Sequence, residues 1–101
     1  GICVGMHILY ESSEEAPGIA GLGLLEGHVR KLDEQPLPRI GWKDVPEAGG
    51  EFYFMHSYSA GVDFVQQAAI TGVQFHPEKS GASGLTFLRA WAQGINVRAV
   101  A

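Results

Sequence analysis

The 101 residues are enough for one domain with a modest core, and we expect residues 1–101 to form a single domain. A net charge of −4 argues against nucleic-acid binding, which needs a basic face, and no apolar run approaches the ~20 residues that span a bilayer. The single cysteine permits no internal disulfide and fits a reducing compartment, so we expect a cytoplasmic protein.

The first residues place Cys3 between two glycines, Gly1 and Gly5, each two positions away. This spacing is typical of a sharp strand-to-helix turn that holds a nucleophile at the end of a sheet. A helix is expected from residue 6 to about residue 15, ending before Pro17, and its N-terminus should favour the thiolate form of Cys3. The alternative is a buried structural cysteine in a glycine-rich turn.

A turn of this kind needs a strand running into it, yet only two residues precede Cys3. A parallel sheet also needs more strands and crossover helices than the pattern predicts here. We therefore expect a fragment whose upstream strands and helices are missing. The alternative is a small complete domain whose first strand comes from a partner chain.

The middle of the chain predicts short strands separated by loops. Strands are expected at residues 22–25, 28–32 and 52–58, and loops at residues 33–38 and 43–50. Residues 60–69 fit either a strand or a helical turn. Trp42 follows a glycine in a loop, where it is either a packing anchor or an exposed interface residue.

The last third predicts a strand and a helix on either side of a polar motif. Residues 70–75 are expected to form a buried strand that runs straight into His76-Pro77-Glu78. Residues 85–92 predict an amphipathic helix, and residues 95–101 a loosely held tail. The core face of this helix is expected to carry Leu85, Leu88 and Trp91.

The chemistry of a thiol connects the two ends of the chain. A thiol is mostly protonated at neutral pH, so it needs a neighbouring base to act as a nucleophile. His76 can supply that base, and Glu78 can fix the tautomer and orientation of His76. Because Pro77 cannot continue central sheet pairing, both side chains should stay at the end of their strand, beside Cys3. Cys3, His76 and Glu78 therefore form a candidate Cys-His-Glu triad.

Two other interpretations of these residues remain open. His76 and Glu78 alone fit a hydrogen-bonded histidine at a strand end beside a solvated glutamate. Cys3 and His7, one helical turn apart, could bind a metal with a further histidine, although the chain lacks the paired ligand spacing of zinc sites.

Several segments match class I (triad) glutamine amidotransferases in the order of that family. They are GICVGM (1–6), LYESSEEAPG (9–18), GLG (21–23), LP and IGW within 37–42, YF and HSY within 53–58, and GVQFHPEKS (72–80). The chain closely resembles this family, and within it is most similar to the glutaminase subunit of imidazole glycerol phosphate synthase.

The resemblance implies a fold and a reaction. The fold would be a partial flavodoxin-like class I glutamine amidotransferase domain, a three-layer α/β structure with a mixed sheet and its N-terminal strands missing. Cys3 would attack the side-chain amide of glutamine, His76 would pass the proton to the leaving ammonia, and Glu78 would orient His76. The backbone N–H of Val4 would donate to the oxyanion. The resemblance implies no cofactor and no metal.

The resemblance also implies contacts with a substrate and a partner. His7, Glu15, Ser57 and Tyr58 occupy positions that hold glutamine in the family. Trp42 occupies a position that faces the cyclase subunit. Such a subunit would form a heterodimer with the cyclase and supply it with ammonia in histidine biosynthesis.

The chain departs from the family pattern at several positions. The family usually has glutamine at His7, histidine at Arg39 and asparagine at Lys43, and segments 45–52 and 58–73 are shorter than usual. One alternative is therefore an inactive fragment or remnant limited to partner binding. Another is the amidotransferase component of a different synthase, such as anthranilate or aminodeoxychorismate synthase.

Overall fold

The computed structural model describes residues 1–94, so the expectation for the tail at 95–101 lies outside the described residues. No helix in this described part is long and apolar enough to cross a membrane. The elements in chain order are α1 (Val4–His7), β1 (Ser12–Ser13), β2 (His28–Lys31), β3 (Arg39–Val45), the 3-10 turn η1 (Pro46–Ala48), β4 (Gly50–His56), β5 (Tyr58–Ser59), β6 (Phe64–Gln67), β7 (Ile70–Val73), the 3-10 turn η2 (Pro77–Lys79) and α2 (Gly81–Ala92).

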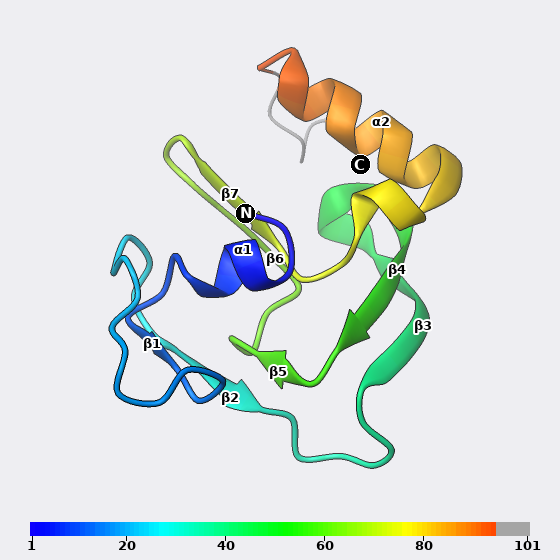
Figure 1. Cartoon of the computed structure of the whole chain (residues 1–101). Coiled ribbons are helices and arrows are strands. Elements are labelled where there is room, and N and C mark those ends of the chain that lie inside the picture. Colours follow the sequence, from blue (N-terminus) through cyan, green and yellow to red (C-terminus); the bar gives the residue numbers. More distant parts are fainter. Residues whose placement is uncertain (95–101) are drawn as a thin grey trace.

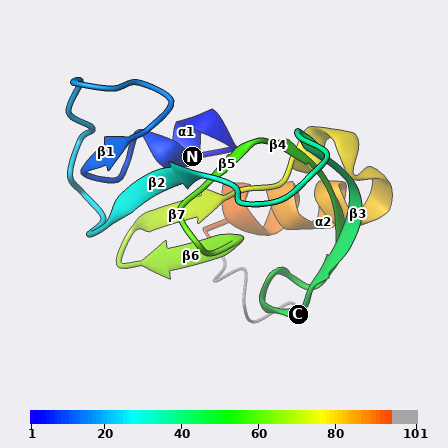
Figure 2. The same cartoon turned by 90° about the horizontal axis from the view of Figure 1, so that it is seen from below.

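The strands form small sheets of mixed direction. β1 pairs with β2 in parallel and β2 pairs with β5 in antiparallel orientation, while β3–β4 and β6–β7 are antiparallel hairpins. Ile2 forms a parallel bridge to Val73 in β7. Figures 1 and 2 both place α2 at the end of the molecule opposite β1 and β2. The chain is thus a small α/β structure with mixed sheets.

An aromatic core joins α2 to the strands that lead into the His-Pro-Glu motif. Phe52 of β4 stacks on Phe75 with ring centroids 4.0 Å apart, and Phe87 of α2 meets the Phe75 ring edge-on at 5.4 Å. Phe52 and Phe75 are fully buried. This core fixes the backbone on both sides of His76.

The expected core face of the last helix is wrong. Gly84, Phe87 and Ala90 are the buried residues of α2, whereas Leu85 and Trp91 are about half exposed. The buried face is set by the aromatic cluster and by a close backbone approach, because a Cβ at Gly84 would clash with the carbonyl oxygen of Pro77. Only glycine lets the helix pack this near to η2.

The expected helix at residues 6–15 is also wrong, because α1 ends at His7. Beyond it the backbone bonds to the loop at residues 21–27 instead of continuing the helix. Leu22 N–H donates to the carbonyl of Ile8, Leu25 N–H to that of Leu9, and Glu11 N–H to that of Gly27. These bonds enclose a second small core, whose buried members are Met6, Tyr10, Leu25 and Val29.

Most of the remaining strand and loop predictions are confirmed, including the loop at 33–38. The strands at 28–32, 52–58 and 70–75 are confirmed within a few residues by β2, β4 and β7, and the ambiguous segment 60–69 contains β6. No strand forms at 22–25. The loop expected at 43–50 is wrong for its first part, because β3 continues to Val45 and carries Trp42 within the hairpin.

Candidate active site

Cys3 occupies a strained turn between the parallel bridge and α1. Its backbone lies at φ 53° and ψ −111°, a left-handed region that non-glycine residues rarely adopt. Two hydrogen bonds hold it there, from Cys3 N–H to the Val73 carbonyl at 2.7 Å and from Val73 N–H to the Gly1 carbonyl at 2.9 Å. A Cβ at Gly1 would clash with the carbonyl of Gly5, so the turn requires this glycine. The geometry is that of a nucleophile elbow.

The surroundings of the thiol do not favour the thiolate, contrary to the expectation from the sequence. Cys3 is 9% exposed, and its burial raises the pKa of the thiol. The Val4 N–H and the Gln74 amide lower this pKa, while the carboxylates of Glu15 and Glu78 raise it further. Burial is the largest of these effects. In addition, α1 has only four residues, too few for a substantial helix dipole.

His76 and Glu78 form the pair expected at the end of β7. Nδ1 of His76 lies 2.8 Å from Oε2 of Glu78. Since an ionised carboxylate only accepts, Nδ1 carries the hydrogen and Nε2 of neutral His76 is left as the base. The pair follows β7, the strand whose last residue is hydrogen-bonded to Cys3. Within residues 1–94, however, no hydrogen bond joins His76 to Cys3.

A cavity of about 240 Å³ opens at Cys3. All four side chains expected to hold a substrate line it, together with Cys3, Val4, Pro38, Met55 and His56. These four are His7, Glu15, Ser57 and Tyr58. His76 and Glu78 do not line this cavity. Residues from four separate segments therefore converge on the nucleophile.

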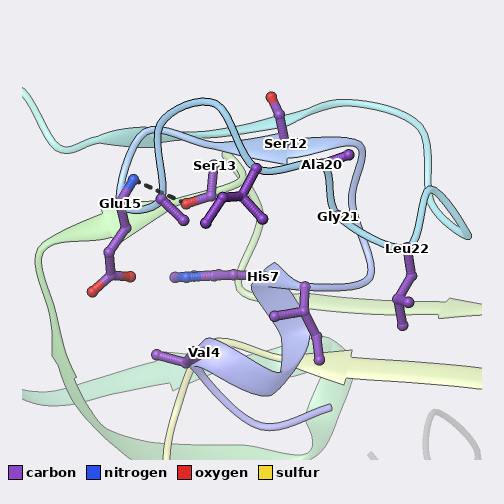
Figure 3. A pocket seen from close by; sticks show the side chains of 11 residues that line it. Val4, His7, Ser12, Ser13, Glu15, Ala20, Gly21 and Leu22 are labelled. Atoms are coloured by element: carbon purple, nitrogen blue, oxygen red, sulfur yellow. Dashed lines mark hydrogen bonds between the residues drawn. The ribbon is translucent and has the colours of Figure 1, made fainter.

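A second, mostly apolar pocket of about 270 Å³ adjoins the cavity through Val4, His7 and Glu15. Figure 3 shows the His7 ring pointing from α1 toward Glu15, whose backbone N–H donates to Oγ of Ser13 at 3.1 Å. The Glu15 carboxylate is thereby placed beside His7 by a local turn. Glu15 thus places a carboxylate at the boundary between the cavity at Cys3 and the apolar pocket.

Comparison with known proteins supplies the family. No protein-family model matches the chain. Imidazole glycerol phosphate synthase subunit HisH of Exiguobacterium sibiricum is 42% identical over 110 positions, covering 92% of this chain and 56% of that protein. The HisH proteins of Thermus thermophilus and Thermotoga maritima are 42% and 41% identical over 87% of the chain. The chain is a homologue of HisH.

The chain spans about half the length of the HisH relatives it matches. The alignment with the Exiguobacterium protein runs over 110 positions although this chain has 101 residues, so HisH carries insertions relative to the chain. This agrees with the expectation that some segments are shorter than in the family.

Trp42 lies on the outer face of the β3–β4 hairpin and is 55% exposed. Its ring meets the edge of the Tyr53 ring on the neighbouring strand, with centroids 5.8 Å apart. The same face carries Ile40 opposite Met55, both exposed. The sequence left open whether Trp42 is a packing anchor or an interface residue, and in the structure its ring is at the surface, where it packs on the edge of the Tyr53 ring.

The two basic residues that depart from the family pattern each have an acidic partner. Arg39 forms an ion pair with Glu34, and Nζ of Lys43 lies 2.6 Å from Oδ2 of Asp63. Both pairs flank Trp42 along β3. Both basic residues alternate with Ile40 and Trp42 along the strand, so their charged side chains belong to the other face of the hairpin.

Two polar residues of the site were not predicted as site residues. Gln74 is fully buried beside Cys3, and the signal that could have revealed it is an amide inside the apolar run of residues 70–75. His56 is 5% exposed, and its Nδ1 donates to the carbonyl of Tyr58 at 2.9 Å. In the sequence, His56 appears only as part of the HSY segment that matches the family.

The alternative of a metal bound by Cys3, His7 and a further histidine has no third ligand among the described residues. Among residues 1–94 no group of three or more histidine, cysteine, aspartate or glutamate side chains could hold a metal ion. Nε2 of His7 instead lies 2.7 Å from Oε1 of Gln74. His7 is thus engaged with an amide rather than with the Cys3 sulfur.

Proposed function

We propose that the chain is the catalytic part of a glutaminase subunit of imidazole glycerol phosphate synthase. It hydrolyses glutamine to glutamate and supplies the ammonia to a cyclase subunit in histidine biosynthesis. The homology to HisH supports the assignment to this synthase. The free Cys3 fits a reducing compartment, and we place the reaction in the cytoplasm.

One observation carries the proposal: Cys3 stands at φ 53° in an elbow that is hydrogen-bonded to the strand leading to His76 and Glu78. Strain of this kind persists only where the surrounding structure enforces it, and it collects at active sites. A structural cysteine needs no such turn, so the geometry favours a nucleophile.

The reaction follows from the placement of the protons. Nε2 of His76 removes the proton of the Cys3 thiol, and the sulfur attacks the amide carbon of glutamine. The Val4 N–H donates to the oxyanion that forms. When the carbon–nitrogen bond breaks, His76 returns the proton to the leaving ammonia and a thioester remains on Cys3. Water, deprotonated by His76, then attacks the thioester, the carbon–sulfur bond breaks, and glutamate leaves.

The cavity at Cys3 suits an amino-acid substrate. The carboxylate of Glu15 can attract the α-ammonium group of glutamine, and Ser57 and Tyr58 add hydroxyl groups to the lining of the same cavity. His7 stands where the family usually has glutamine. In this proposal it contacts the substrate from α1.

The exposed face of the β3–β4 hairpin is the proposed docking site for the cyclase subunit. Trp42, Ile40 and Met55 form an apolar patch there, and aromatic anchors of this kind dominate protein interfaces. Met55 also lines the cavity at Cys3. A partner seated on the patch would therefore lie next to the released ammonia.

The proposal includes the fold of the complete protein. Residues 1–101 would form the C-terminal part of a single flavodoxin-like class I amidotransferase domain, consistent with a match to about half of HisH. A further apolar pocket of about 270 Å³, separate from the two near Cys3, supports this placement within a larger domain. Its lining includes Ile2, Val73, Leu88 and Trp91. Further strands of the domain would cover this pocket and the exposed side of α2, which the sequence predicts to be apolar.

The test is release of glutamate from glutamine by the 101-residue chain, with and without a cyclase subunit, beside Cys3→Ala. Activity that exceeds the Cys3→Ala background is the expected result. A glutamine-analogue electrophile should also modify Cys3 and leave Cys3→Ala unmodified. Activity equal to that of Cys3→Ala under both conditions would favour a remnant limited to partner binding.

A further inference from the structure

The strand that leads to the His-Pro-Glu motif places a second side chain against the nucleophile. Because Ile2 bridges Val73 in parallel, the next residues on the two strands, Cys3 and Gln74, come level with each other. Nε2 of Gln74 lies 3.6 Å from Sγ of Cys3, within hydrogen-bonding range for sulfur. Gln74 is fully buried, so no water competes for its amide.

The other end of the Gln74 amide is held by His7. Oε1 of Gln74 lies 2.7 Å from Nε2 of His7, which is 4% exposed. A carbonyl oxygen can only accept, so Nε2 of His7 carries the hydrogen. That bond orients the amide with its oxygen toward His7 and its NH₂ group toward the sulfur. Nδ1 of His7 has no hydrogen-bond partner within the described residues, so Gln74 is the group that fixes the ring.

We propose that Gln74 donates a hydrogen bond to the Cys3 thiolate and that His7 is the positioning residue that keeps the Gln74 amide in the donating orientation. This inference rests on the proposed function, in which Cys3 is the nucleophile. It adds a group that touches the reacting sulfur and gives His7 a role besides contact with the substrate.

The thiolate of Cys3 needs such a donor. It is formed in a buried position and faces two carboxylates, Glu15 and Glu78, both of which oppose a negative sulfur. A neutral amide can stabilise the thiolate without adding a charge that would attract the carboxylates into the site. The Val4 N–H also lies near the sulfur, but the proposed mechanism needs it for the oxyanion as well.

The test measures the thiol directly, without glutamine. Iodoacetamide alkylation of the full 101-residue chain is followed by mass spectrometry between pH 7 and pH 10.5, and Cys3 is the only cysteine that can react. Gln74→Met keeps the size of the side chain and removes the donor. The rate at pH 8 should fall about tenfold, equivalent to a rise of about one unit in the pKa of Cys3.

A matched control and two further variants separate this role from packing. Gln66→Met changes a glutamine in β6 whose Oε1 has no hydrogen-bond partner among the described residues, and it should leave the rate within about twofold. His7→Phe should slow alkylation in the same direction as Gln74→Met. His7→Gln supplies an amide donor again and should restore the rate. Equal pH profiles for the wild type, Gln74→Met and His7→Phe would overturn the proposal.

Circular dichroism shows which variants fold. If Gln74→Met does not fold, Gln74→Glu is used in its place, because it keeps the shape and puts a carboxylate beside the sulfur. Its alkylation should be more than tenfold slower, and an unchanged rate would overturn the proposal. Glutamate release is measured separately, so loss of that activity in the wild type rejects the proposed function while the alkylation profiles still decide the role of Gln74.

Discussion

The backbone N–H of Cys3 donates to the carbonyl oxygen of Val73 across 2.7 Å, which ties the elbow to β7. β7 ends at Val73, the residue of this bridge, and His76 follows three residues later. The N-terminal and C-terminal thirds of the chain are thus joined by backbone atoms at the site itself. This single register determines which side chains can reach the thiol.

Replacing Glu78 by glutamine should slow glutamine hydrolysis without unfolding the chain. The uncharged amide cannot stabilise the imidazolium of His76, so kcat should fall on the order of 10²-fold while KM for glutamine stays nearly constant. The melting temperature should change little, because Glu78 is 51% exposed and such pairs contribute less than about 1 kcal/mol. Glu47→Gln, an exposed carboxylate on η1, is the control. Equal kcat in both variants would remove Glu78 from the mechanism.

Replacing Gly84 by alanine should destabilise the chain, although alanine is the better helix former. Helix propensity alone would stabilise by about 0.8–1.0 kcal/mol. A Cβ at this position would meet the Pro77 carbonyl oxygen, and overpacking of this kind costs about 1–3 kcal/mol. Urea unfolding followed by circular dichroism measures the difference. The exposed Thr86→Ala in the same helix should be neutral or stabilising, and a gain in stability for Gly84→Ala would contradict the observed packing.

The two tryptophans should differ in their effect on the cyclase complex, although both are more than half exposed. Trp42→Ala should raise the Kd for the cyclase subunit at least about tenfold, since a central aromatic anchor is lost. Trp91→Ala, on α2, should leave the Kd within about twofold. Isothermal titration calorimetry measures both. Equal Kd values would move the partner away from the β3–β4 hairpin.

His56 should make the chain less stable in mild acid. Its burial lowers the pKa of the imidazole, and the positive charge of Arg39 acts in the same direction. The unfolded chain therefore binds the proton more tightly, so the free energy of unfolding falls as the pH drops below the ordinary value of 6.5. Thermal melts at pH 7.5 and pH 5.5 should show this drop. It should shrink in His56→Asn and persist in His28→Asn, where the histidine is exposed on β2.

Local sequence patterns predicted the parts of the site that depend on neighbouring residues. The glycines around Cys3 predict the elbow, because a sharp turn needs small side chains whatever packs around it. The run of aromatic residues in β4 and the apolar run before His76 also predict strands, because such residues are enriched in strands. His76 and Glu78 are two residues apart, so their hydrogen bond also follows from local geometry.

The tertiary structure decided everything that depends on distant segments. The helix after Cys3 ends at His7 because residues 21–27 supply other partners for its backbone. The buried face of α2 is decided by the aromatic cluster and the contact of Gly84 with Pro77. The pKa of Cys3 is raised because burial depends on the whole fold. Gln74 reaches the sulfur only through the pairing of residues 71 positions apart, and no local pattern specifies that register.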